Sequence, residues 1–243
     1  FFKKKKINFF DRIFYAFYIK KNVEDQSIII SRSLISSMLL SIFNKKNIVE
    51  LHNPPTGFTN WIFIIYRFFG LDKNLGYIFL HKNLKKVLKI NKGLILDDAV
   101  DYEDFKKIKK KSIKKFCYVG SLFKGKGIET ILKLAKKFPN EKFHIYGDKK
   151  TLEKTKFKNK NVFEKNILFY DFRSYRFIPK ILKSSKFLLL PYSNQVFVNS
   201  DSLEVANYMS PLKMFDYLAA GRIILASNLN VYSHILKNNY NCF

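Results

Sequence analysis

Two lysines and several glycines stand together where an apolar stretch ends, in Tyr118-Val-Gly-Ser-Leu-Phe-Lys-Gly-Lys-Gly127. Glycine lets a backbone approach a ligand closely, and the start of a helix presents free N–H groups with partial positive charge. Lys124 and Lys126 add cationic donors, so such a loop between a strand and a helix suits a diphosphate. It is neither a Walker loop nor a dinucleotide Gly-x-Gly-x-x-Gly. An ordinary turn that needs glycine explains the segment equally well.

The second distinctive segment is Ser210-Pro-Leu-Lys-Met-Phe-Asp-Tyr-Leu-Ala-Ala-Gly221. Serine followed by proline predicts a helix whose N-cap is Ser210 and whose first residue is Pro211, and the closing glycine predicts its end. Lys213 then lies in the first turn, where the helix dipole disfavours a cation unless an anion is also present. Asp216 can accept hydrogen bonds from two ribose hydroxyls. Taken by itself, it is better interpreted as a surface aspartate.

Together these segments resemble the retaining GT-B glycosyltransferases of family 4. The resemblance covers about Phe116 to Cys242 and extends more weakly into the first half. The glycine loop is similar to the family's Gly-Arg-x-x-x-x-Lys-Gly, with Gly120 and Lys126 in register. Leu188-Leu-Leu-Pro-Tyr192 is similar to the strand before the donor loop. The proline segment resembles the Ser-Pro-Leu-Lys-x-Phe-Glu-Tyr variant of the family's Glu-x7-Glu motif.

The resemblance implies that the second half of the chain binds a nucleotide-sugar donor. The glycine loop and the start of the proline-containing helix would hold the diphosphate, and Asp216 the ribose. Gly147, Tyr170 and Asp171 would fall near the base pocket. The residues assigned to the donor in this way are Gly120, Ser121, Lys126, Gly147, Tyr170, Asp171, Ser210, Pro211, Leu212, Lys213 and Asp216.

Three positions depart from the family pattern. Ser121 replaces the arginine that usually pairs with the diphosphate, so Lys126 and Lys124 would carry that charge. Tyr208 replaces the first glutamate of Glu-x7-Glu, and Asp216 is one methylene shorter than the usual second one. These departures leave open a degenerate, non-catalytic subunit.

In the first half, Ile48-Val-Glu-Leu-His-Asn-Pro54 resembles the strand end where many relatives place a histidine that faces the donor sugar. His52 is therefore the second candidate catalytic residue beside Lys126. A histidine in a turn before Pro54-Pro55 is the competing interpretation.

The resemblance implies transfer of a sugar with retention of configuration. The expected donor is a nucleotide-diphosphate sugar such as a UDP- or GDP-sugar, and the expected acceptor is a glycan or a lipid-linked molecule. No cofactor and no essential metal are expected. A GT-B-type nucleotide-sugar epimerase is the alternative that keeps the fold and changes the reaction.

Charge and composition bound the partners. The chain has 243 residues with a formal charge of +26 and 26 Phe. The charge suggests an anionic partner, although a compositional bias explains it as well, since the lysines are scattered as well as clustered. A basic nucleic-acid-binding module is the alternative from another class. No RNP-type, zinc or helix-turn-helix signal accompanies the charge, so we expect no nucleic acid partner.

Compartment follows from cysteine usage and hydropathy. Cys117 and Cys242 form no pairing pattern, which favours a reducing, cytoplasmic compartment. The most apolar windows, Leu34–Phe43 and Trp61–Gly70, have about half the length of a bilayer span. The basic, aromatic start of the chain suggests peripheral docking on the anionic inner face of the cell membrane. A packed helix beside compositional lysines is the favoured alternative.

These segments need a scaffold, and short apolar runs alternating with amphipathic ones predict one built from βα units. Strands are expected at Ser27–Ile30, Ile48–His52, Tyr77–Leu80, Gly93–Leu96, Phe116–Val119, Phe143–Tyr146, Asn166–Phe169, Phe187–Leu190 and Ile223–Ser227. Helices are expected at Asn8–Lys20, Ser33–Phe43, Asn60–Phe69, Asn83–Leu88, Ile128–Phe138 and Leu212–Ala220.

The expected fold is α/β of the GT-B type, with two Rossmann-like, doubly wound parallel-sheet domains facing a cleft. The lysine-rich segment Lys106–Lys115 is interpreted as a connector or a solvated helix, which gives an acceptor-side domain over residues 1–105 and a nucleotide-sugar domain over residues 106–243. The opening βα unit of the first domain is missing. Because Phe1 is no initiator methionine and the chain stops at Phe243, we expect a fragment cut at both ends.

Overall fold

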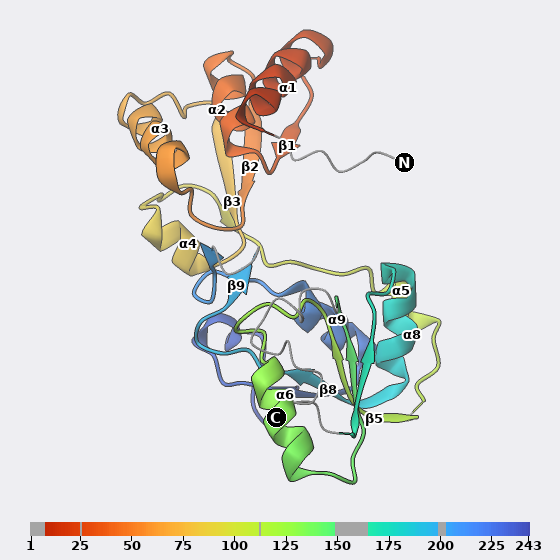
Figure 1. Cartoon of the computed structure of the whole chain (residues 1–243). Coiled ribbons are helices and arrows are strands. Elements are labelled where there is room, and N and C mark those ends of the chain that lie inside the picture. Colours follow the sequence, from red (N-terminus) through yellow and green to blue (C-terminus); the bar gives the residue numbers. More distant parts are fainter. Residues whose placement is uncertain (1–7, 25, 112, 149–164, 199–202) are drawn as a thin grey trace. The chain divides into compact units, whose positions relative to one another are not determined.

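The computed structural model describes residues 8–24, 26–111, 113–148, 165–198 and 203–243, and it divides into two units, Phe1–Asp97 and Asp98–Phe243 (Figure 1). The division falls ahead of the boundary predicted between residues 105 and 106. The reason is α5 (Glu103–Lys106), whose Phe105 is buried in the core of the second unit. Side-chain burial thus assigns the residues before the lysine-rich connector to the second unit.

The first unit contains a parallel sheet whose strands follow one another in chain order. In the described residues these are β1 (Ile29–Ser31), β2 (Asn47–Leu51), β3 (Leu75–Phe79) and β4 (Leu94–Ile95). The helices between and before them are α1 (Phe9–Asn22), α2 (Leu34–Ile42), α3 (Gly57–Phe68) and α4 (Lys82–Val87). Each was predicted. The largest shift is at the start of α3, which begins at Gly57 rather than Asn60 because Gly57 adopts φ +54° and turns the chain into the helix.

Helix α1 has a well-defined start and a narrow buried stripe. The Asn8 side chain accepts from the Asp11 N–H while the Asp11 carboxylate accepts from the Asn8 N–H, a reciprocal capping box. Ala16 and Ile19 pack against Leu40 of α2. The helix therefore packs on α2 through a narrow apolar stripe, while its aromatic side chains are exposed.

The second unit contains a parallel sheet in the order β11-β8-β5-β6-β7. Its strands are β5 (Lys114–Val119), β6 (Phe143–Tyr146), β7 (Ile167–Tyr170), β8 (Ser185–Leu190) and β11 (Ile223–Ala226). The chain adds β6 and β7 on one side of β5 and then crosses to add β8 and β11 on the other. The strand order therefore reverses between β5 and β8, as in a doubly wound fold.

Helices cover both faces of this sheet. On one face Tyr118 packs with Ile128 and Ile131 of α6 (Ile128–Lys137). On the other face Cys117 packs with α8 (Ile178–Lys183) and α9 (Leu212–Ala220). Because neighbouring residues of β5 lie in opposite cores, the strand is apolar from Phe116 to Val119, and the predicted α/β class is confirmed.

Several elements of the second unit were not predicted. They are α5, α8, the hairpin of β9 (Phe197–Val198) and β10 (Leu203–Glu204), and the 3₁₀ turns η2 (Tyr175–Phe177) and η3 (Asn230–Tyr232). All are short, so their apolar periodicity is too brief to recognise. None of the described helices has both the length and the apolar character that a bilayer span requires.

Candidate active site

The reversal of strand order brings the carboxyl ends of β5 and β8 side by side. Gly120 follows β5, and Pro191 and Tyr192 follow β8. In open α/β sheets a ligand binds outside the carboxyl ends of the strands at such a switch point. The two segments with chemical character, the glycine loop and the start of α9, both lie here.

Gly120 and Gly127 are glycines for different reasons. Gly120 has φ +145°, and a Cβ there would lie 2.6 Å from Lys213 Cε and 2.7 Å from Lys213 Nζ. Gly127 has φ +86°, and a Cβ there would lie 1.9 Å from the Pro191 carbonyl oxygen. Gly127 therefore serves the packing of the loop on the end of β8. Gly120 leaves room for a lysine that comes from α9.

Lys213 is a buried cation without an acceptor. Its Nζ is inaccessible although part of its stem is exposed, and no described residue accepts a hydrogen bond from it. The nitrogen lies 3.6 Å from the centroid of the Tyr118 ring and 5.1 Å from that of Tyr192. Burial, and next the charge of Lys126, lower the pKa of Lys213 well below its usual value, while Asp216 partly opposes them. Such a group is costly unless an anion joins it.

Lys126 approaches the same place from the glycine loop. Its Nζ lies 4.9 Å from the centroid of the Tyr192 ring, on which Lys213 also converges. Burial lowers the pKa of Lys126 to about 8. Two ammonium groups from distant parts of the sequence therefore share one aromatic ring and disfavour each other's charge, which is the arrangement that a dianion between them would relieve.

The start of α9 differs from the prediction in one respect. Pro211 is the N-cap, with ψ 109°, and no side chain caps the helix. Ser210 is not the cap, because its Oγ accepts from the Asp98 N–H at 2.9 Å. Leu212 and Lys213 therefore begin the helix. Its first-turn N–H groups carry the partial positive charge of a helix N-terminus beside the two lysines.

A cavity of about 530 Å³ lies against this cluster. Among its lining residues are Gly120, Leu212, Lys213 and Asp216, all of them predicted donor residues. Asp216 accepts a hydrogen bond from the Tyr175 hydroxyl at 2.8 Å and is 9 % exposed. Burial raises its pKa, against smaller opposing effects of Tyr175 and Lys213. The structure thus brings the predicted carboxylate into one cavity with the buried lysine.

The remaining predicted donor residues lie around the ends of β5, β6 and β7. A Cβ on Gly147 would lie 2.5 Å from the Gly120 carbonyl oxygen, so the two glycines touch. The Ser121 carbonyl accepts from the Tyr118 hydroxyl at 2.7 Å, and its side chain is exposed. Tyr170 stacks on Tyr146 with 4.4 Å between centroids. Asp171 follows Tyr170 and is exposed.

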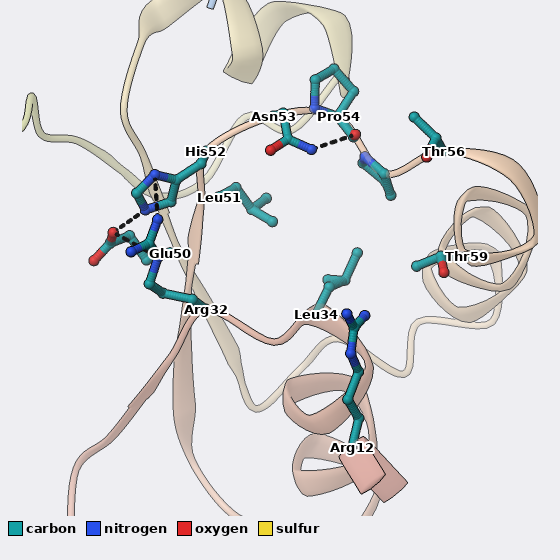
Figure 2. A pocket seen from close by; sticks show the side chains of 11 residues that line it. Arg12, Arg32, Leu34, Glu50, Leu51, His52, Asn53, Pro54, Thr56 and Thr59 are labelled. Atoms are coloured by element: carbon teal, nitrogen blue, oxygen red, sulfur yellow. Dashed lines mark hydrogen bonds and ion pairs between the residues drawn. The ribbon is translucent and has the colours of Figure 1, made fainter. Parts of the chain in front are cut away.

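His52 lies at the end of β2 in the first unit, and Figure 2 shows its surroundings. Its Nδ1 is 2.8 Å from an Arg32 guanidinium nitrogen, and its Nε2 contacts Glu50. Arg32 and Glu50 also form an ion pair at 3.8 Å. The side chain therefore belongs to a hydrogen-bonded triad, which is more than the turn interpretation requires.

The family model for glycosyl transferases group 1 matches residues 100–243. The chain belongs to this family. The matched region of this group 1 glycosyl transferase holds every predicted donor residue and Lys126, whereas His52 lies outside it.

Solved structures match the group 1 chain over both units. TarM aligns over 96 % of the chain with 17 % identity and a TM-score of 0.65. A glycosyltransferase from Rickettsia africae ESF-5 aligns over 100 % with 15 % identity and a TM-score of 0.65. An E. coli protein described as trehalose-6-phosphate, bound with UDP-2-fluoro glucose, aligns over 92 % with 12 % identity and a TM-score of 0.60. The likeness confirms the GT-B fold.

The group 1 chain spans only part of these proteins. It covers 48 % of TarM, 69 % of the Rickettsia protein and 63 % of the E. coli one. No curated protein matches the sequence.

Sequence reasoning missed the aromatic residues of the site. The rings of Tyr118 and Tyr192 contact the two lysines, and the Tyr175 hydroxyl donates a hydrogen bond to Asp216. Tyr192 was seen only as part of a strand pattern. Its position directly after a buried strand and a proline was the available signal, since such positions face the ligand edge of a parallel sheet.

Proposed function

We propose that this group 1 glycosyl transferase moves a sugar from a nucleotide-diphosphate donor to a glycan or lipid-linked acceptor with retention of configuration. The observation that carries the proposal is Lys213, whose buried amine at the switch point of the second unit has no hydrogen-bond acceptor among the described residues. A donor diphosphate would supply the missing anion. Lys126 and the start of α9 add positive charge at the same place.

The charges suit the chemistry of leaving-group departure. Cleavage of the bond between C1 and the diphosphate oxygen leaves an additional negative charge on the diphosphate. Lys213, Lys126 and the α9 N-terminus would stabilise that charge without an essential metal, because they are oriented before the reaction begins. The replacement of the family's arginine by Ser121 then removes little of the site's positive charge, since Lys126 and Lys213 both approach the Tyr192 ring.

Asp216 and the neighbouring strand ends would bind the nucleoside. In the proposal the carboxylate accepts from the ribose hydroxyls, with Tyr175 fixing its orientation through a 2.8 Å hydrogen bond. Gly147, Tyr170 and Asp171 stay the predicted base pocket. His52 stays the predicted residue at the donor sugar, held by Arg32 and Glu50.

A thermal-shift screen of UDP-, GDP- and ADP-sugars tests the proposal directly. One nucleotide should raise the melting temperature, because a ligand that binds only the folded state stabilises it. The Lys213→Met variant should lose that shift. If no nucleotide shifts the wild type, the donor assignment is wrong. Incubating the identified donor alone separates transfer from epimerisation, since an epimerase alters the sugar without an acceptor.

We also propose a cytoplasmic location with peripheral docking on an anionic membrane. The exposed aromatic face of α1 supports it, since Phe10, Phe14 and Tyr18 are 66 %, 71 % and 63 % exposed. Lys20 and Lys21 end the same helix. Wild-type protein should sediment with vesicles of phosphatidylglycerol and phosphatidylcholine, and a Phe10→Ser/Phe14→Ser variant should stay in the supernatant. Equal sedimentation of both proteins would contradict the docking face.

A further inference from the structure

The first unit has a polar cavity of its own, of about 370 Å³. Its walls come from separate elements: Arg12 from α1, Arg32 from the end of β1, His52 from the end of β2, and Thr56 and Thr59 from the start of α3. Figure 2 shows the Arg12 guanidinium pointing into this space, which Leu34 and Thr59 also line. Basic and hydroxyl groups thus converge here from segments far apart in the sequence.

The two arginines that line this cavity differ in their interaction partners. Arg32 is engaged with Glu50 and His52. No described residue accepts a hydrogen bond from the Arg12 guanidinium or pairs with it. The backbone of Arg12 is fixed, because its carbonyl accepts from Ser36 Oγ at 2.9 Å. Among the described residues that line the cavity, the only acidic one is Glu50, which already contacts Arg32 and His52, so Arg12 has no carboxylate partner there.

The other donors surround the same space. The Thr56 side chain makes no capping bond to α3, a helix of 12 residues, so neither its hydroxyl nor the first-turn N–H groups are used by a cap. Thr59 adds a second hydroxyl one turn inside. Donors from α1 and α3 in different directions suit the oxygens of a tetrahedral phosphate group. A planar carboxylate would be satisfied by one arginine fork.

We propose that this cavity binds a phosphate group of the acceptor, with Arg12, Thr56 and Thr59 as its donors. The acceptor would then be a phosphorylated molecule, either a soluble sugar phosphate or a lipid-linked phosphate. The identification of this phosphorylated ligand as the acceptor rests on the proposed function. The binding of phosphate in the cavity is independent of that function.

Isothermal titration separates this site from the general attraction of a chain with formal charge +26. Inorganic phosphate should bind the wild type, and glucose should not. Arg12→Gln should weaken phosphate binding about 10- to 100-fold, because a charged hydrogen-bonded pair is lost. Lys86→Gln removes the same charge from an exposed position of α4 in the same unit and should leave the affinity unchanged. Equal weakening by both variants, or no phosphate binding by the wild type, overturns the inference.

Thr59→Val guards against misfolding, since it keeps the shape of the side chain and removes one hydroxyl. It should weaken phosphate binding severalfold at an unchanged melting temperature, and unchanged affinity would remove Thr59 from the site. Nucleotide titration of the same Arg12→Gln protein distinguishes the two proposals. Loss of phosphate affinity with intact nucleotide affinity supports the inference. If the wild type binds phosphate but no nucleotide, the proposed function is wrong and the phosphate site stands.

The source of the phosphate is decided by two further titrations. Glucose 6-phosphate competes with inorganic phosphate if the acceptor is soluble. Vesicles containing 20 mole per cent of a phosphatidic acid, against vesicles of phosphatidylcholine alone, should compete if it is lipid-linked, with a loss of competition in Arg12→Gln. If neither competes, the cavity does not take a phosphate monoester, and the inference is wrong.

Discussion

The two units differ in how deeply they bury a cation that lacks a partner among the described residues. In the second unit Lys213 is buried against Tyr118 with no acceptor among the described residues, and Lys126 lowers its pKa further. In the first unit Arg32 is exposed and pairs with Glu50, and Arg12, which has no such partner among the described residues, is only half-buried. Burying an amine with no anion beside it disfavours its charged form, whereas an exposed ion pair contributes little to stability in either direction. A buried amine of this kind in a folded domain indicates a ligand-binding site, so the donor site is expected in the second unit.

The largest effect should come from removing the buried charge. Lys213→Met keeps most of the stem, and turnover should fall about 10²–10³-fold because a preorganised donor to the leaving group is lost. The melting temperature should hold or rise, since the variant no longer buries an unpaired charge. Kinetics and a melting curve of the same sample check both. Lys136→Met, at an exposed site on α6, is the matched control. Wild-type turnover in a folded Lys213→Met protein would contradict the comparison.

Lys126→Ala should follow with a loss of about 10²-fold, at the lower end of that range. Its effect is smaller because this lysine is partly exposed, so water can replace some of what it supplies. Steady-state rates at saturating donor measure the loss. A variant that turns over as fast as wild type would leave Lys213 as the sole cationic donor of the site.

Asp216→Asn should weaken binding of the nucleotide roughly tenfold, because an amide replaces a charged acceptor of ribose hydroxyls. The 2′-deoxy nucleotide should bind wild type about as weakly as the ribonucleotide binds the variant. Titration of both nucleotides with both proteins forms a cycle. If wild type and Asp216→Asn prefer the ribonucleotide over its 2′-deoxy form to the same extent, Asp216 does not bind the ribose. Tyr175→Phe removes only the 2.8 Å hydrogen bond to this carboxylate and should have a smaller effect.

The smallest effect is on stability. The pKa of Lys126 is about 8 in the folded state, below its usual value near 10.5. Between these values the unfolded chain binds more protons, so the free energy of unfolding rises with pH in that window, by at most about 1.4 kcal/mol per pH unit. Between pH 8 and pH 10, urea unfolding should show a more positive change in the free energy of unfolding for wild type than for Lys126→Met, in which Lys213 still contributes. Parallel behaviour of the two proteins would show that Lys126 is not desolvated.

Much of the fold was predictable because long amphipathic and apolar runs report it. The strand Phe143–Tyr146 and the helix Leu212–Ala220 have the predicted bounds. The helix α8 and the hairpin of β9 and β10 were missed, since they have too few residues to show a period. The sequence also pointed to the wrong cap for α9. Ser210 accepts instead from Asp98, a partner more than one hundred residues away that no local pattern reveals.

The sequence predicted which residues form the site, but not their burial or their hydrogen-bond partners. The pattern identified Gly120, Lys126, Lys213 and Asp216, and the structure brings Gly120, Lys213 and Asp216 to one cavity, with Lys126 at the same ring as Lys213. Burial and the absence of an acceptor belong to tertiary structure. So does the close approach of Lys213 to Gly120, whose φ of +145° is a conformation that side chains rarely adopt.

Proton uptake on nucleotide binding tests the central claim most directly. If a diphosphate pairs with the two lysines, their lowered pKa values rise on binding, and the protein takes up protons above pH 8. Isothermal titration at pH 8.5 in buffers of different ionisation enthalpy measures that number. We predict a net uptake in wild type, a smaller one in Lys126→Met and Lys213→Met, and an affinity that falls as the pH rises. Binding with no proton uptake in wild type would contradict the account.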